Sequence, residues 1–194
     1  MRQKQTSTLE IGKRQIFLPW LSELGTSLLS SLHGEKSWTI ARFLVTNGFD
    51  IEHPIDDLGI SVLEKVLDDP EKVLGLSKVG ANPNMTKDNG TCSIATLTAS
   101  YAPRGVVKIL VRAGTDFGRR NVFPRAALFS DTERIPVMEY LLDNCLVDIQ
   151  QVENSYMKDN EILIGRGTAL HMAVSVNSIK NVRFLLSKGA AEAR

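Results

Sequence analysis

The feature that most constrains the fold is residues 167–190, GTALHMAVSVNSIKNVRFLLSKGA. Apolar residues recur there at helical spacing in two short runs, 169–176 and 179–186, with Asn177 and Ser178 between them. Each run is too short to be a stable helix by itself and is apolar on one side only. The sequence therefore predicts two short helices joined by a tight turn, a unit that needs neighbours to cover its apolar sides.

The ends of these two runs carry residues that start and stop helices. Thr168 provides the side-chain oxygen of an N-cap at the start of the first run. Lys188 lies in the last turn of the second run, where a cation suits the helix dipole, and Gly189 follows it. Glycine readily adopts the left-handed conformation that ends a helix.

These residues resemble the ankyrin repeat. The family's Thr-Pro-Leu-His tetrapeptide is similar to residues 168–171, with Ala169 in place of proline, and its closing Leu-Leu-x-x-Gly-Ala is similar to residues 185–190. The resemblance implies that His171 forms a hydrogen bond between repeats. The positions assigned to the repeat signature, in this unit and in earlier ones, are Thr168, Leu170, His171, Ala173, Leu185, Leu186, Gly189, Gly48, Gly80 and Gly114.

Helix-ending residues recur upstream at the spacing of a repeat. They are Gly48, Gly80, Gly114, Cys145 and Gly189, with a cysteine where glycine is expected. The successive intervals are 32, 34, 31 and 44 residues, and the first three bracket the ankyrin period of about 33. The last interval is longer because residues 151–166 are inserted, and this insertion is either a binding finger or a neutral addition.

We therefore predict an all-α fold, an ankyrin-type helical solenoid of about five helix–turn–helix repeats with projecting turns. Residues 1–24 are expected to form an N-terminal tail and partial cap, followed by the array over 25–194. The predicted repeats are 25–57, 58–90, 91–121, 122–150 and 167–194.

Details of the degenerate second and fourth repeats are also predicted. The first helix of the second repeat is expected over residues 60–69, and Pro70 is suited to the first turn of the next helix. In the fourth repeat, residues 124–127 are expected in place of the tetrapeptide, and Pro136 at the start of the second helix.

No pattern of catalytic or metal-binding residues emerges. The three histidines form no zinc motif, and Cys92 and Cys145 lie 53 residues apart with no partner motif, as expected of reduced thiols in an intracellular protein, cytoplasmic or nuclear. The net charge is +1 and no run of 18 apolar residues occurs. We expect no catalysis, cofactor, metal or small-molecule substrate, and neither nucleic acid nor membrane as a partner.

Charge is distributed unevenly along the chain. Residues 50–71 hold eight acids and one base, residues 104–125 six bases and one acid, and residues 131–161 eight acids and two bases. Within the basic band, Lys108 and Arg112 are expected on the solvent-exposed outer face of a second helix. Arg119 and Arg120 instead follow Phe117 in a turn beside the concave face that ankyrin arrays use for binding, where their charge would steer an acidic partner.

The resemblance thus implies a protein–protein interaction module that binds another protein, one with an acidic segment, through its concave face and turn tips. The alternatives are a regulatory or targeting fragment of a larger multidomain protein and a self-associating structural array. The candidate protein-binding residues are Phe117, Arg119, Arg120, Met85, Lys87, Tyr156 and Lys158.

Overall fold

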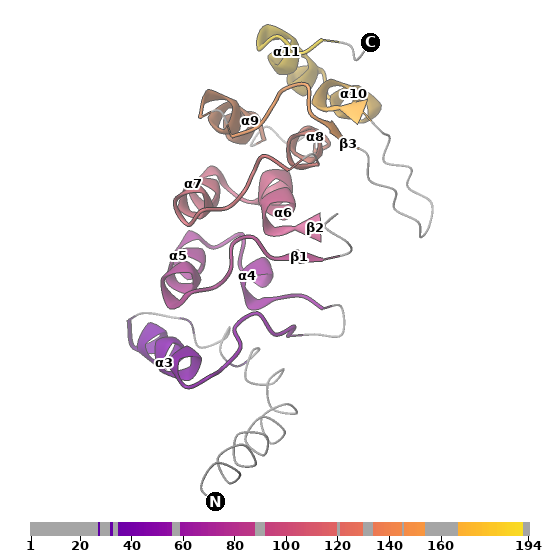
Figure 1. Ribbon diagram of the computed structural model, residues 1–194. Helices are drawn as coiled ribbons and strands as arrows, with labels where there is room; N and C mark the ends of the chain where they lie inside the picture. The colour runs from indigo at the N-terminus through magenta and orange to yellow at the C-terminus, as the bar shows by residue number, and fades with distance from the viewer. Residues whose placement is uncertain are drawn as a thin grey trace, which may run out of the picture. The chain divides into compact units, whose positions relative to one another are not determined.

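Nearly all regular structure in the computed structural model of the chain is helical (Figure 1). Within the residues that the structure describes there are nine helices, and the strands are only two residues long. The described residues are 27, 32, 35–55, 59–87, 92–119, 121–129, 134–144, 146–153 and 167–191. A mostly helical fold is therefore confirmed.

The chain divides into two compact units, residues 1–65 with 78–81 and residues 66–77 with 82–194. In the first unit, α3 (Glu35–Thr46) forms where the second helix of the first repeat is predicted. The helix expected over residues 60–69 is much shorter, because α4 spans only Val62–Lys65.

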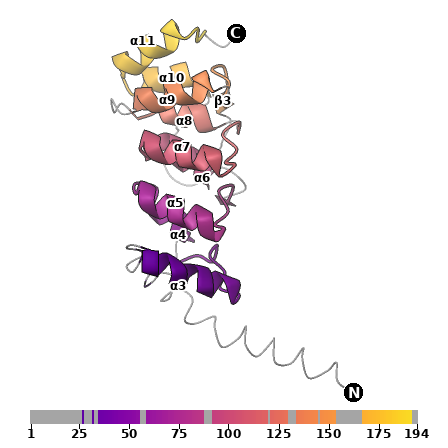
Figure 2. The same ribbon diagram turned by 90° about the vertical axis from the view of Figure 1, so that its left-hand side faces the viewer.

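The second unit contains the remaining helices, although the last two residues of α5 fall in the first. These helices are α5 (Pro70–Val79), α6 (Ile94–Tyr101), α7 (Arg104–Arg112), α8 (Val122–Ala127), α9 (Arg134–Asp143), α10 (Ala169–Ser175) and α11 (Ile179–Ser187). Helices α6, α8 and α10 form an inner row, in which α8 packs against both neighbours (Figure 1). Helices α7, α9 and α11 form an outer row, which faces the viewer in Figure 2.

The glycines predicted to end helices do so in left-handed conformation. The φ angles of Gly48, Gly80, Gly114 and Gly189 are 92°, 98°, 86° and 91°. After Gly189, the Ala190 N–H donates to the Leu185 carbonyl at 3.0 Å, which is the bond of a Schellman motif. The same bond closes α3, α7 and α9, at 2.9, 3.0 and 3.0 Å.

The N-terminus of α10 is stabilised by its own residues. The Thr168 N–H donates to Nδ1 of His171 at 3.2 Å, and the Thr168 hydroxyl lies 2.9 Å from the same nitrogen. The resemblance implies that His171 forms a hydrogen bond to another repeat. Among the residues that the structure describes, His171 is instead hydrogen-bonded to Thr168 of its own repeat.

The first helix in the predicted fourth repeat starts elsewhere than expected. Helix α8 begins at Val122 with Asn121 as its N-cap, so residues 121–124 occupy the place of the tetrapeptide, and the prediction of residues 124–127 is wrong. Pro124 lies in the first turn of α8. Backbone N–H groups there have no helical carbonyl to donate to, so the missing N–H of proline costs no hydrogen bond. Pro70 begins α5 and Pro136 lies in the first turn of α9, as predicted.

The loops between helix pairs contain two short hairpins. Strand β1 (Thr86–Lys87) pairs antiparallel with β2 (Cys92–Ser93), and β3 (Val152–Glu153) pairs antiparallel with β4 (Gly167–Thr168). The inserted residues from 154 to 166 lie outside the described residues, between two strands that are paired with each other.

Lys188 links the last two helices of the outer row. Its ammonium lies 3.3 Å from the carboxylates of both Asp143 and Glu139 on α9. Hydrogen bonds to Asp143 and then to Glu139 raise the pKa of Lys188 above its ordinary value. The end of α11 is therefore joined to α9 by two ion pairs.

Candidate protein-binding surface

The loops that precede α6, α8 and α10 lie along one side of the second unit, and the first and last of them contain the hairpins (Figure 1). We call this side the hairpin edge. It comprises residues 82–87, 92–93, 114–119, 121, 146–153 and 167–168.

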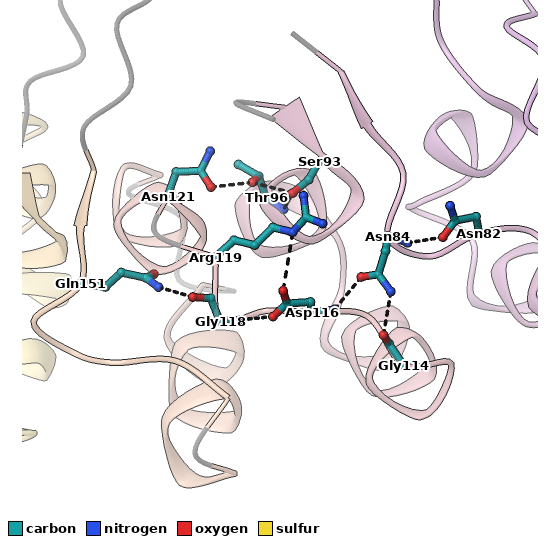
Figure 3. A network of polar contacts seen from close by, with 10 residues as sticks. All are labelled: Asn82, Asn84, Ser93, Thr96, Gly114, Asp116, Gly118, Arg119, Asn121 and Gln151. Atoms are coloured by element: carbon teal, nitrogen blue, oxygen red, sulfur yellow. Dashed lines mark hydrogen bonds and ion pairs between the residues drawn. The ribbon is translucent and has the colours of Figure 1, made fainter. Parts of the chain in front are cut away.

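Asn84 joins two neighbouring loops of the hairpin edge (Figure 3). Its amide nitrogen donates to the Gly114 carbonyl at 2.9 Å, and its amide oxygen accepts from the Asp116 N–H at 2.7 Å. Its own backbone N–H donates to the side chain of Asn82 at 2.9 Å. Because both atoms of the amide are used, the two loops are held in one register.

Two glutamines repeat this arrangement further along the edge. Gln151 donates to the Gly118 carbonyl at 3.0 Å and accepts from the Phe123 N–H at 3.2 Å. The Gln150 amide, in the orientation that satisfies both of its atoms, accepts from the Ala191 N–H at 2.9 Å and donates to the Ala191 carbonyl at 3.2 Å. Amide side chains therefore connect successive loops and make the edge an ordered surface.

A buried polar cluster lies beneath the edge. The Ser93 hydroxyl accepts from the Thr96 N–H at 3.1 Å, and the two hydroxyls lie 2.9 Å apart. The Thr96 hydroxyl donates to the amide oxygen of Asn121 at 3.3 Å, so the start of α6 is bonded to the start of α8 (Figure 3).

Arg119, a predicted binding residue, lies on the hairpin edge with 31% of its side chain exposed. Its Nε is 3.7 Å from a carboxylate oxygen of Asp116, whose other oxygen accepts from the Gly118 N–H at 2.9 Å (Figure 3). An exposed ion pair of this kind contributes little to stability. It does, however, offset part of the positive charge that Arg119 presents.

The other predicted binding residues are less uniformly placed. Phe117 is 1% exposed and belongs to the core, so the expectation that it touches a partner is wrong for this conformation. Met85 is half-buried beside Asn84, and Lys87 lies in β1. Arg120, Tyr156 and Lys158 lie outside the described residues.

Sequence reasoning missed two groups of surface residues. One group is the amides, Asn84, Gln150 and Gln151, although amides that recur shortly before each projecting turn were a visible signal. The other group is large apolar side chains that the helical pattern assigns to the core. These are Ile40, Phe43, Leu74, Tyr101, Val174, Ile179 and Leu186, each more than two-fifths exposed.

In the part of the chain that the structure describes, no group of three or more histidine, cysteine, aspartate or glutamate side chains could hold a metal ion. The same residues include no helix with the length and apolar character required to cross a bilayer.

Residues 167–193 match the family described as the ankyrin repeat. The chain carries an ankyrin repeat. This matched repeat comprises β4, α10 and α11, and the ankyrin repeat is in general a protein–protein interaction module. No curated protein matches the sequence.

A second helix pair has the same layout as the matched ankyrin repeat. Strand β2, the first residues of α6 and α7, and Gly114 each precede their counterparts in β4, α10, α11 and Gly189 by 75 residues. This constant offset assigns to each residue of the matched ankyrin repeat an equivalent in the α6–α7 pair.

Proposed function

We propose that the chain is a non-catalytic intracellular module, cytoplasmic or nuclear, that binds a partner protein through the hairpin edge and the inner row of helices. The proposal includes an array of about five repeats with the predicted bounds. The observation that carries it is the ordered hairpin edge, in which Asn84, Gln150 and Gln151 hold successive loops in register. A surface that is ordered before binding loses less conformational entropy when a partner docks.

The proposed partner presents an acidic segment to the turn that contains Arg119 and Arg120. The sequence from 104 to 125 has an excess of five positive charges. Opposite charge accelerates encounter more than it strengthens the final complex. Since Asp116 offsets part of the Arg119 charge, an acidic partner would compete with Asp116 for the guanidinium.

A charge-reversal experiment tests this proposal. The full chain and the double variant Arg119→Glu/Arg120→Glu are used as baits in lysate, and a protein captured by the first is then titrated against both. We expect the double variant to lose at least about tenfold in affinity, which corresponds to about 1.4 kcal/mol.

A matched control is Lys108→Glu/Arg112→Glu, which reverses two exposed charges on α7 of the outer row. This control should retain the affinity of the unchanged chain. Equal binding by all three proteins would contradict the proposed site, and circular dichroism establishes that each variant is folded.

A further inference from the structure

Three loops of the hairpin edge form the same turn, but only two of them form it with a charged side chain. The side-chain oxygens of Asn82, Asp116 and Asp148 each accept a hydrogen bond, at 2.9 Å, from the backbone N–H two residues further on. Asparagine and aspartate both stabilise turns in this way. Because Asn82 accepts the bond with a neutral amide, the turn does not require the negative charges of Asp116 and Asp148.

The fold makes little other use of these two charges. The second oxygen of Asp116 lies 3.7 Å from Nε of Arg119, and 61% of the Asp116 side chain is exposed. A charge-assisted hydrogen bond measures about 2.7–2.9 Å, so this contact is loose, and solvent weakens it further. Asp148 is exposed and forms no ion pair with any residue that the structure describes. Both carboxylates are therefore accessible to a partner.

The two loops that carry these carboxylates meet at Gly118 (Figure 3). The Gly118 carbonyl accepts from the side chain of Gln151, in the loop that contains Asp148, at 3.0 Å. A Cβ built at Gly118 would lie 3.2 Å from a carboxylate oxygen of Asp116 and 3.9 Å from the Leu146 carbonyl oxygen. The charged side chains on these loops are therefore presented from an ordered backbone.

We call Asp116, Arg119 and Asp148 the charged triplet. It contains one cation and two carboxylates, although residues 104–125 taken together are basic. A segment that is only acidic would pair with Arg119 but would also place negative charge beside Asp116. Like charges brought together oppose association, whereas opposite charges favour it. A segment with a base beside its acid would match charges of both signs.

We propose that the acidic segment of the partner also carries a basic side chain, so that its acid pairs with Arg119 and its base with the carboxylates of the charged triplet. This inference rests on the proposed function and specifies the partner further. Because the charged atoms of Asp116 and Arg119 are 3.7 Å apart, the two charges of the partner must be close neighbours on one face of the segment. Side chains three or four residues apart in a helix, with Cβ atoms about 5–6 Å apart, meet this requirement.

Three synthetic peptides of equal length test the charge pattern. The first carries glutamate and lysine four residues apart, the second has the lysines replaced by glutamine, and the third has the glutamates replaced by glutamine. Fluorescence anisotropy at low ionic strength would measure the binding of each peptide to the full chain. We expect the first peptide to bind at least about threefold more tightly than either of the others, which is the size of effect that an exposed ion pair produces.

The double variant Asp116→Asn/Asp148→Asn removes both carboxylates and retains the turns, since Asn82 forms the same bond with an amide. In this variant the purely acidic peptide should bind at least as tightly as the first peptide. The matched control is Asp143→Asn, which removes an exposed carboxylate from α9 of the outer row and should leave the preference for the first peptide unchanged.

Equal binding of the first two peptides by the unchanged chain would overturn this inference, as would a preference for the first peptide that survives in the double variant. The proposed function is tested separately by Arg119→Glu. If the first two peptides bind equally and Arg119→Glu weakens both, the acidic partner stands and only the paired base is wrong. Binding that Arg119→Glu leaves intact, or absence of binding by every peptide, would contradict both proposals.

Discussion

At the residue scale, Gly167 is required by its contact with His171. A Cβ built at Gly167 would lie 2.6 Å from the Cβ of His171 and 2.8 Å from its Cγ. These distances are far inside van der Waals contact, and neither atom is the end of a flexible chain. The capping arrangement of Thr168 and His171 thus depends on a glycine immediately before it.

We predict that Gly167→Ala destabilises the protein by about 1–3 kcal/mol, because the overlap must be relieved by movement of the α10 N-terminus. Urea denaturation followed by circular dichroism would measure the change. Gly105→Ala is the matched control: its nearest neighbour would be Pro70 Cγ at 3.8 Å, and alanine favours α7 by up to about 1 kcal/mol. Equal losses in the two variants would contradict the steric explanation.

The turn that holds Phe117 and Arg119 could be located from the sequence, but the direction of its side chains could not. Phe117 and Arg119 are two residues apart in one turn, yet the phenyl ring is buried and the guanidinium reaches Asp116. Turn residues follow no periodicity, so only packing against neighbouring repeats decides which of them points outward. For the same reason, the bonds of Asn84 across 30 and 32 residues could not be read from local sequence.

At the element scale, α5 is started by the carboxylate of Asp69. This group accepts hydrogen bonds from the backbone N–H of Glu71 and Lys72, at 3.0 and 3.2 Å, and its second oxygen lies 3.1 Å from the Lys72 ammonium. Burial raises the pKa of Asp69, but the hydrogen bonds and the charge of Lys72 together outweigh it, so the pKa lies below its ordinary value of 3.8.

The lowered pKa predicts a pH-dependent contribution to stability. A carboxyl whose pKa is depressed by folding stabilises the native state above its unfolded pKa, and this contribution is lost as the pH falls through the folded pKa. The difference in unfolding free energy between the unchanged chain and Asp69→Asn should be constant near neutral pH and shrink as the pH falls below 3.8. Chemical denaturation at a series of pH values would measure it, and a difference that grew toward low pH would contradict the assignment.

Helix ends were predicted better than helix starts. The positions of Gly48, Gly80, Gly114 and Gly189 identified the ends because only glycine adopts positive φ without strain. The start of α8 was misplaced by three residues, since Pro124 resembles the proline of the tetrapeptide and any of the first helical positions tolerates proline. No residue between 60 and 69 indicated that α4 would be only four residues long.

At the scale of the whole molecule, stability depends on bonds between neighbouring loops. Asn84 belongs to the loop before α6, while Gly114 and Asp116 belong to the loop before α8. Bonds of this kind couple the stability of one helix pair to that of the next. Loss of Asn84 should therefore weaken the connection between the two helix pairs as well as one local turn.

We predict that Asn84→Ala lowers the free energy of unfolding by about 1–3 kcal/mol, since two hydrogen bonds are lost. The denaturation transition should also become broader as neighbouring repeats unfold less cooperatively. Asn144→Ala is the matched control, because the exposed Asn144 side chain, just after α9, donates to the Tyr140 backbone carbonyl of that helix at 2.7 Å. Loss of similar size in both variants, with unchanged slopes, would contradict the coupling between repeats.

The paired strands β3 and β4 have a consequence for how this protein can vary. The hairpin formed by β1 and β2 encloses four residues, 88–91, whereas β3 and β4 enclose thirteen, 154–166. Closing the longer loop costs only about 1 kcal/mol more, because the entropy of closure rises with the logarithm of length. Once the strands are paired, additional residues in this loop destabilise the packed helices very little. The loop can therefore vary in length and sequence while the packing of the helices is preserved.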